Sequence, residues 1–247
     1  MPALTLSFDD PSALGFVAVT AVFAGFVRGF SGFGGPAILI LVLTQFYLPV
    51  TVIAKVLVMD MAASLRLQRD AFAHVQWREV IHLSVASYLG LPVGMVLLYT
   101  VEPDIARRFV AGFVALSTVA MLLGLRFRHA QGLAVWLVFG FSAGIVVGAT
   151  GVALLAMLFL FSMPTSAEVS RANALSWLFA VSPGVLAAHV IGGSLDFDAA
   201  WRALAMGLFY IAGATLGARK FKGVNEALFR RIVAGLLLGL AAIAFVA

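Results

Sequence analysis

The segment from Gly25 to Pro36 reads GFVRGFSGFGGP, a glycine-rich run inside a long hydrophobic stretch, and part of it occurs twice in the chain. The pattern Gly-Phe-x-x-Gly of residues 25–29 recurs at 140–144, an offset of 115, and Pro49 recurs as Pro164 at the same offset. Later matches share an offset of 123: Gly90, Gly94 and the run RRFVAG at 107–112 recur as Gly213, Gly217 and RRIVAG at 230–235. The chain is therefore a duplication whose second copy carries a short insertion, as in many secondary transporters.

The composition excludes a soluble globular protein. Of the 247 residues, 63% are hydrophobic and 11% are charged, and the mean hydropathy is +1.09. Polar side chains are too few to cover this apolar surface in water, so lipid must surround most of the chain. The net charge of +5 would suggest a nucleic-acid partner in a soluble protein, but here the basic residues lie between hydrophobic runs and set the orientation in the membrane. The lack of cysteine excludes disulfides and thiolate metal sites.

Two of the hydrophobic segments are too long for one membrane crossing. A bilayer core of ~30 Å takes about 20 apolar residues as a helix. The segments run over residues 14–47, 50–68, 79–99, 105–125, 132–162, 166–191, 200–218 and 228–247. The first and the fifth exceed 30 residues, and glycines interrupt them at 29–35 and 144–151. Each is either one long broken span or a pair of short helices that enters the membrane and returns.

The distribution of Lys and Arg decides between these two interpretations, because short cytoplasmic loops are rich in both. If each broken segment crosses once, six basic residues lie on one side and seven on the other. If each returns, one side has only Arg107, Arg108 and Arg202, and the other has Arg66, Arg69, Arg78, Arg126, Arg128, Arg219, Lys220, Lys222, Arg230 and Arg231. This asymmetry predicts re-entrant segments and puts both termini on the periplasmic side.

An all-α integral membrane fold of two inverted-topology repeats follows from this crossing pattern. Each repeat, residues 1–128 and residues 129–247, then has a glycine-broken re-entrant pair and three transmembrane helices, and the two together form one membrane domain. In transporters built this way, the substrate site lies near the midplane of the membrane, where the broken helices meet.

Three cations lie inside hydrophobic segments: Arg28, Lys55 and Arg171. Charge inside a membrane is costly and usually functional. Glycines around Arg28 allow backbone N–H groups and a helix N-terminus to face a ligand, and the guanidinium is a bidentate donor for an oxyanion. We therefore expect an anion site. Arg28 in a helix-packing motif with its side chain reaching the interface, Lys55 reaching the interface, and an Arg171–Glu168 ion pair are open alternatives.

The other candidate residues are neutral groups near the glycine breaks and three titratable side chains. We expect the anion to contact the groups Gly29, Ser31, Gly32, Gly34, Gly35, Gly148, Thr150, Gly151 and Asn173, although the hydroxyl and amide groups among them could instead join helices. Asp60, Glu168 and His189 are candidates for coupling transport to protons. Asp60 could equally be the counter-ion of Lys55 or Arg66.

A Ser–His pairing offers an enzymatic alternative. The runs GFSG at 29–32 and AHVIGG at 188–193 resemble the catalytic motifs of rhomboid intramembrane proteases, with Ser31 as nucleophile and His189 as base. The two residues fall in different repeats, and short glycine motifs match by chance in a chain with 24 glycines. We therefore expect a protein that is not an enzyme and has neither cofactor nor metal.

The run GFSGFGGP at 29–36, Pro49, Gly90-x-x-x-Gly94 and their second copies together resemble the TauE/SafE family of sulfite and organosulfonate exporters. The resemblance covers nearly the whole chain. It implies a bacterial inner-membrane permease for sulfite, thiosulfate or sulfonates. The second copy departs from the pattern, since GATGV at 148–152 lacks the doubled glycine and the proline. The expected partners are a small anion and the lipid bilayer, with no nucleic acid; a homodimer, a passive anion channel and a membrane scaffold are open alternatives.

Overall fold

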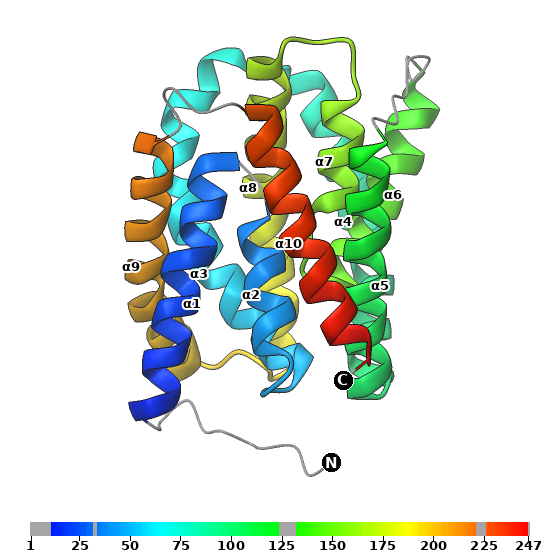
Figure 1. Ribbon diagram of the computed structural model, residues 1–247. Helices are drawn as coiled ribbons and strands as arrows, with labels where there is room; N and C mark the ends of the chain where they lie inside the picture. Colours follow the sequence, from blue (N-terminus) through cyan, green and yellow to red (C-terminus); the bar gives the residue numbers. More distant parts are fainter. Residues whose placement is uncertain (1–10, 32–33, 124–131, 221–225, 247) are drawn as a thin grey trace.

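The computed structural model describes residues 11–31, 34–123, 132–220 and 226–246, and these residues form helices joined by short connections (Figure 1). The elements in chain order are α1 (Pro11–Ser31), α2 (Gly35–Leu43), α3 (Pro49–Ala71), the short 3-10 helix η1 (Phe72–His74), α4 (Trp77–Thr100), α5 (Pro103–Leu122), α6 (Leu133–Thr150), α7 (Leu154–Phe161), α8 (Ala167–Ile191), α9 (Phe197–Lys220) and α10 (Glu226–Val246). The prediction of an all-α fold is confirmed.

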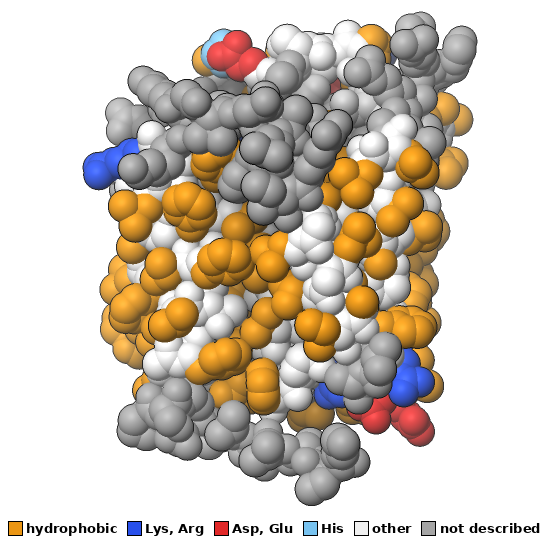
Figure 2. Space-filling view, viewed as in Figure 1, with side chains coloured by type: hydrophobic (Ala, Val, Ile, Leu, Met, Phe, Trp, Pro, Cys, Tyr) orange, Lys and Arg blue, Asp and Glu red, His pale blue; other side chains and the backbone are white. Residues whose placement is uncertain are grey.

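Among the described residues, five helices are long and apolar enough to cross a membrane: α4, α5, α6 and most of α8 and α9. Shorter apolar stretches lie in α1 and α10. Apolar side chains cover the middle of the face shown in Figure 2, and the charged side chains visible there gather at its two ends. Large apolar residues such as Leu89, Leu116 and Leu208 are well exposed, as a surface facing lipid requires.

The first long segment turns back on itself. Helix α1 has 21 residues, but α2 has only 9, which at 1.5 Å per residue is about 13 Å, less than half a bilayer. The ring of Phe46, just after α2, lies 5.3 Å from the ring of Phe16 near the start of α1. Helix α2 therefore runs back along α1, and the segment is a re-entrant pair rather than one broken span.

The fifth segment has the same form. Helix α7 has 8 residues after the 18 of α6. The ring of Phe159, near the end of α7, stacks on Phe139 at 4.2 Å and meets the edge of Trp136, near the start of α6, at 5.0 Å. Both predicted re-entrant pairs are thus present.

A glycine with positive φ marks each break. Gly34 precedes α2 with φ 86°, and Gly151 follows α6 with φ 67°, a conformation that other residues adopt only with strain. Pro36 then fits the first turn of α2, where its missing N–H is not needed. A side chain at Gly151 would also press on Ile53 of α3, since a Cβ there would lie 2.6 Å from the Ile53 Cγ2 atom.

Helices α1 and α9 are in close contact through glycines on both. A Cβ at Gly25 would overlap the Tyr210 carbonyl oxygen, and a Cβ at Gly213 would overlap that of Val22. Such close approach of two backbones is possible only at glycine, and membrane helices use it to associate.

Helices α4 and α6 make the equivalent contact, in which the first repeat supplies the later helix and the second repeat the earlier one. A Cβ at Gly144 would overlap the Ser87 carbonyl oxygen, and a Cβ at Gly90 that of Phe141. Tyr210 follows Ser87 by 123 residues, so the contacts make Gly144, not Gly140, the equivalent of Gly25. For these helices the offset is 119, one helical turn longer than the sequence match suggested.

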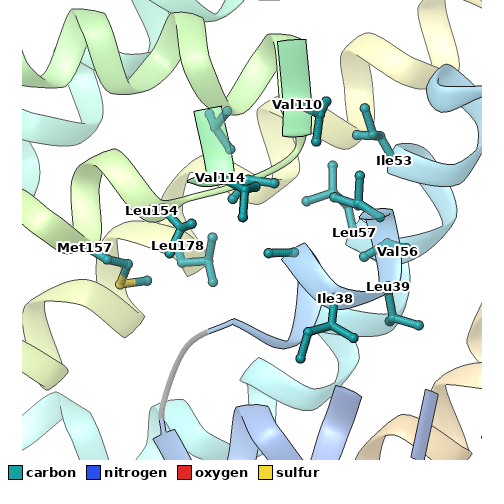
Figure 3. Packing of buried hydrophobic residues seen from close by; sticks show 14 of the residues in the cluster. Ile38, Leu39, Ile53, Val56, Leu57, Val110, Val114, Leu154, Met157 and Leu178 are labelled. Carbon is teal, nitrogen blue, oxygen red and sulfur yellow. The ribbon is translucent and has the colours of Figure 1, made fainter. Parts of the chain in front are cut away.

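The short helices α2 and α7 lie inside the molecule. Figure 3 shows their side chains in one apolar interior with α3, α5 and α8: Ile38 and Leu39 of α2, Ile53, Val56 and Leu57 of α3, Val110 and Val114 of α5, Leu154 and Met157 of α7, and Leu178 of α8. The surrounding helices thus shield both breaks from lipid, as irregular backbone at membrane depth requires.

Candidate functional site

The two glycine breaks meet at one small cavity. It has a volume of about 20 Å³, room for little more than one water molecule. Gly34 and Pro36 line it from the first break, and residues 151–154 line it from the second. The first turns of α2 and α7 also begin here, and N–H groups in a first turn have no partner within their own helix.

Two charged residues, Arg28 of α1 and Asp60 of α3, complete the lining. The Arg28 Nε atom lies 2.7 Å from Asp60 Oδ1, and its Nη2 atom donates a hydrogen bond to Oδ2 at 3.1 Å. The side chains are 1% and 3% exposed. The Arg28 side chain is therefore buried and does not reach outward to the interface, so this part of the alternative is wrong, whereas Gly25 and Gly29 do pack against α9 as its other part expects. Asp60 is thus the counter-ion of Arg28, a pairing that the sequence analysis did not consider; the side chain of Arg66, one of the partners considered there, lies outside the described residues.

Two further buried groups fix the ion pair. Ser64, one helical turn after Asp60, accepts a hydrogen bond from Arg28 Nη2 at 3.0 Å. The Tyr210 hydroxyl of α9 donates to Asp60 Oδ1 at 2.9 Å. The carboxylate is thus held by two helices other than its own. Hydrogen bonds of this kind are what make a buried ion pair tolerable.

Gly35, the first residue of α2, leaves the space that this cluster occupies. A Cβ at this position would overlap the Tyr210 hydroxyl and would lie 2.7 Å from the Arg28 Cβ atom. Of the predicted glycines, Gly34 and Gly151 line the cavity, and Gly35 shapes the cluster beside it.

Other predicted residues serve the contacts between helices. A Cβ at Gly29 would overlap the Ala214 carbonyl oxygen of α9, and one at Gly148 would lie 2.8 Å from that of Leu91 of α4. The Thr150 hydroxyl donates to the Val146 carbonyl oxygen at 2.7 Å and accepts from the Val152 N–H at 3.1 Å, so it stabilises the second break. The side chain of Ser31, and Gly32, lie outside the described residues.

Asn173 is also engaged away from the cavity. Its Oδ1 atom accepts from the Gln76 backbone N–H at 2.8 Å, and its Nδ2 atom donates to the Gln76 side chain at 3.0 Å. This pair of hydrogen bonds joins α8 to the residue that precedes α4. Asn173 therefore holds helices together and does not lie with Arg28.

The two remaining cations do not line the cavity. Arg171 is half-buried on α8, close enough to Arg28 for the two charges to repel each other. Lys55 lines a second cavity of about 300 Å³, together with Arg202, Met59 and Met206. Only one of the three predicted cations is thus a lining residue of the central cavity.

Glu168 and His189, the other two candidates for proton coupling, do not line the central cavity either. Glu168 is exposed near the start of α8, where its Oε1 atom lies 3.5 Å from His74 Nε2. His189 is buried near the end of α8, and its Nδ1 atom lies 2.7 Å from Ser194 Oγ and 3.3 Å from the Tyr99 hydroxyl. Among the described residues these two hydroxyls contact His189, and the predicted pairing with Ser31 falls on a side chain outside them.

The sequence analysis missed Ser64 and Tyr210. Ser64 could have been found, because a residue four positions after Asp60 shares its helix face. Tyr210 gave no such signal, since a tyrosine in an apolar segment is usually an interfacial residue.

Comparison with known proteins gives the family. The family described as Sulfite exporter TauE/SafE matches residues 17–244, nearly the whole chain. The chain belongs to the TauE/SafE family. Neither the curated proteins nor the solved structures compared contain a match. As a TauE/SafE member with several helices apolar enough to span a bilayer, the protein is a membrane protein of transporter type.

Proposed function

We propose that this protein is a multi-pass carrier of small sulfur-containing oxyanions, namely sulfite, thiosulfate and sulfonates, and that Arg28 binds the anion. The observation that carries this proposal is the buried Arg28 guanidinium in a cavity lined by both glycine breaks. The guanidinium offers two N–H donors, and the N-termini of α2 and α7 add favourable dipoles. The sulfur in the substrate is supported by family membership alone.

Alternating access is the mechanism we propose. It is supported by the equivalent glycine contacts of α1 with α9 and of α6 with α4, which fit two repeats of inverted topology around a central site. The small volume of the cavity, about 20 Å³, fits this mechanism, because the site must widen before it can admit any of the proposed anions. Binding then requires the cavity to open toward one side of the membrane.

The orientation follows from the basic residues. The start of α1 and the end of α10 lie at the same end of the molecule (Figure 1). Arg78 begins α4 and Arg219 lies near the end of α9, at the opposite end. We place that opposite end in the cytoplasm of a bacterial inner membrane, and both termini in the periplasm.

Counterflow in proteoliposomes tests the proposal. Vesicles loaded with unlabelled sulfite are diluted into labelled sulfite, beside matched pairs of thiosulfate, an alkanesulfonate and sulfate. We expect saturable exchange of at least one sulfur anion. Arg28→Gln should reduce exchange about 10- to 150-fold, as expected for loss of a hydrogen-bonded charge worth about 1.5–3 kcal/mol. Arg108→Gln, which removes an exposed arginine on α5, is the matched control and should exchange normally.

Two outcomes would overturn the proposal. Absence of exchange for all four anions in folded protein removes the substrate class, and flux without counterflow indicates a channel instead. Since Arg28→Gln leaves Asp60 without its partner, the double variant Arg28→Gln/Asp60→Asn keeps the centre neutral and separates loss of binding from misfolding. Normal exchange in the double variant would exclude Arg28 as the binding residue.

A further inference from the structure

We propose that the Asp60 carboxylate occupies, in the empty carrier, the place that the transported anion takes on Arg28, and that the anion therefore binds together with a proton on Asp60. This inference rests on the proposed function of the same site. It assigns Asp60 as the coupling residue and makes the proton an obligatory partner of the anion.

The geometry of the ion pair supports the first step. Arg28 presents its Nε and Nη2 atoms to the two oxygens of Asp60, at 2.7 and 3.1 Å. Sulfite and sulfonate groups offer the same edge of two oxygens to a guanidinium. An anion that binds this edge must displace the carboxylate, so the two compete for the same donors.

Burial supports the second step. If the anion takes Arg28, the Asp60 charge loses its charged partner at a position where Asp60 is only 2% exposed. A buried charge without a partner is strongly unfavourable, and a proton removes the charge. The proton passes from water on the open side to an Asp60 oxygen, and it leaves to water on the other side with the anion. No covalent bond other than this O–H bond forms or breaks.

The charge balance predicts the stoichiometry. The pair is neutral when the site is empty, a monovalent anion makes it negative, and one proton restores neutrality. Among the side chains that the structure describes, the titratable and charged groups that act on the pair are Tyr210 from α9 and Arg171 from α8, while the cavity lining from α2 and α7 is backbone and apolar side chains. Lys55 lies on Asp60's own helix, in the second cavity. None of these groups is a second carboxylate, so Asp60 is the proton acceptor.

Proteoliposomes carrying Asp60→Asn test this assignment with an alkanesulfonate as the probe, because a sulfonate is monovalent and, unlike sulfite, does not itself titrate near neutral pH. Two quantities are measured in the same vesicles: counterflow without a gradient, and accumulation driven by a pH gradient that is acid on the side of uptake. The variant changes the exchange rate itself, so the decisive quantity is the ratio of accumulation to counterflow. In wild-type protein a gradient of about one pH unit should give up to tenfold accumulation beyond passive distribution. In Asp60→Asn accumulation should vanish while exchange persists. Glu168→Gln, an exposed carboxylate, should behave as wild type.

An unchanged ratio in Asp60→Asn overturns the inference. A folded Asp60→Asn protein without any exchange does so too, because a neutral amide should leave Arg28 available to the anion. If the variant does not fold, calorimetry on wild-type protein in two buffers of different ionisation enthalpy counts the protons that are taken up when an anion binds. Sulfate is a suitable anion for this measurement because it does not titrate near neutral pH. Binding of sulfate, or of a sulfonate that exchanges, without proton uptake would overturn the inference. Wild-type protein that exchanges no anion at all instead refutes the proposed function.

Discussion

Replacement of Gly35 by alanine tests the architecture of the charged centre. The new methyl group would overlap the Tyr210 hydroxyl and would lie 2.7 Å from the Arg28 Cβ atom and 2.8 Å from the Ala24 carbonyl oxygen. The last of these is backbone of α1, which cannot move without shifting the helix. The substitution must therefore displace Tyr210 from Asp60 or separate α2 from α1.

The expected loss follows from these contacts. Overpacking of a dense interior costs about 1–3 kcal/mol. Loss of the 2.9 Å hydrogen bond from Tyr210 to the Asp60 carboxylate costs about 1.5–3 kcal/mol. Alanine gains about 1 kcal/mol over glycine as a helix former. The sum is a decrease of roughly 1.5–5 kcal/mol in the free energy of unfolding.

Unfolding of the purified protein in detergent measures this loss. Gly15→Ala and Gly239→Ala are the controls, since a Cβ at either position meets nothing within 4 Å. Both should be neutral or slightly stabilising. Tyr210→Phe in the Gly35→Ala background removes the overlapped oxygen, so the double variant should be destabilised less than the sum of the two single variants, with a coupling of at least about 1 kcal/mol. Gly35→Ala as stable as Gly15→Ala, or additive effects in the double variant, would refute the geometry of the centre.

Three further substitutions test other parts of the molecule. Gly94→Ala places a Cβ against the Ile145 carbonyl oxygen at the α4–α6 contact and should lower stability by about 1–3 kcal/mol relative to Gly239→Ala in the same unfolding assay. Asn173→Ala removes both hydrogen bonds to Gln76 and should lower stability by about 1–3 kcal/mol, with unchanged sulfite counterflow in the protein that remains folded. Lys55→Gln should raise the KM of counterflow several-fold with little effect on kcat. Lys55 lines the second cavity and not the central one, so it attracts the anion only at long range. If Gly94→Ala is as stable as Gly239→Ala, the close α4–α6 contact at Gly94 is refuted. A counterflow defect in folded Asn173→Ala would contradict a purely structural role of Asn173. A lower kcat in Lys55→Gln would contradict a long-range role of Lys55.

The membrane fold and its broken helices were predictable from the sequence because they follow from length and composition. A segment of more than 30 residues is too long for one membrane span and too short for two, and glycines interrupt it in the middle. A chain that turns back at the glycines fits both the length of the segment and the position of the break. The register of the duplication was not predictable in this way. Glycines at Gly140, Gly144 and Gly148 repeat every four residues, so two alignments one turn apart match equally well, and only the contacts of Gly144 with Ser87 decide between them.

Of the charged centre, the two ionised residues were predictable from the sequence, but their partners were not. A charge inside an apolar segment indicates a functional residue, and this led to Arg28 and Asp60. Position along a helix gives depth in the membrane but does not give the direction of the side chain relative to other helices. For this reason Lys55 and Arg171 were expected beside Arg28, yet Lys55 lines another cavity and Arg171 contributes only its charge. Tyr210 was missed because it reaches Asp60 through the packing of α9 against α3, which the sequence does not give.

The two copies of the duplication differ at the positions that form the Arg28–Asp60 centre. By the offsets that the contacts define, Arg28 corresponds to Val147 and Tyr210 to Ser87. Val147 is buried and apolar, and the Ser87 hydroxyl accepts a hydrogen bond from Trp177 Nε1 at 3.0 Å and joins α4 to α6 through the Gly140 carbonyl oxygen. The second copy therefore keeps the glycine contacts and the break but replaces the ion pair with packing. A second buried arginine at Val147 would add a further positive charge to the interior of the molecule. The two copies thus share the glycine contacts that join the helices, and they differ at the ion pair. This difference keeps one arginine matched with one carboxylate at the centre.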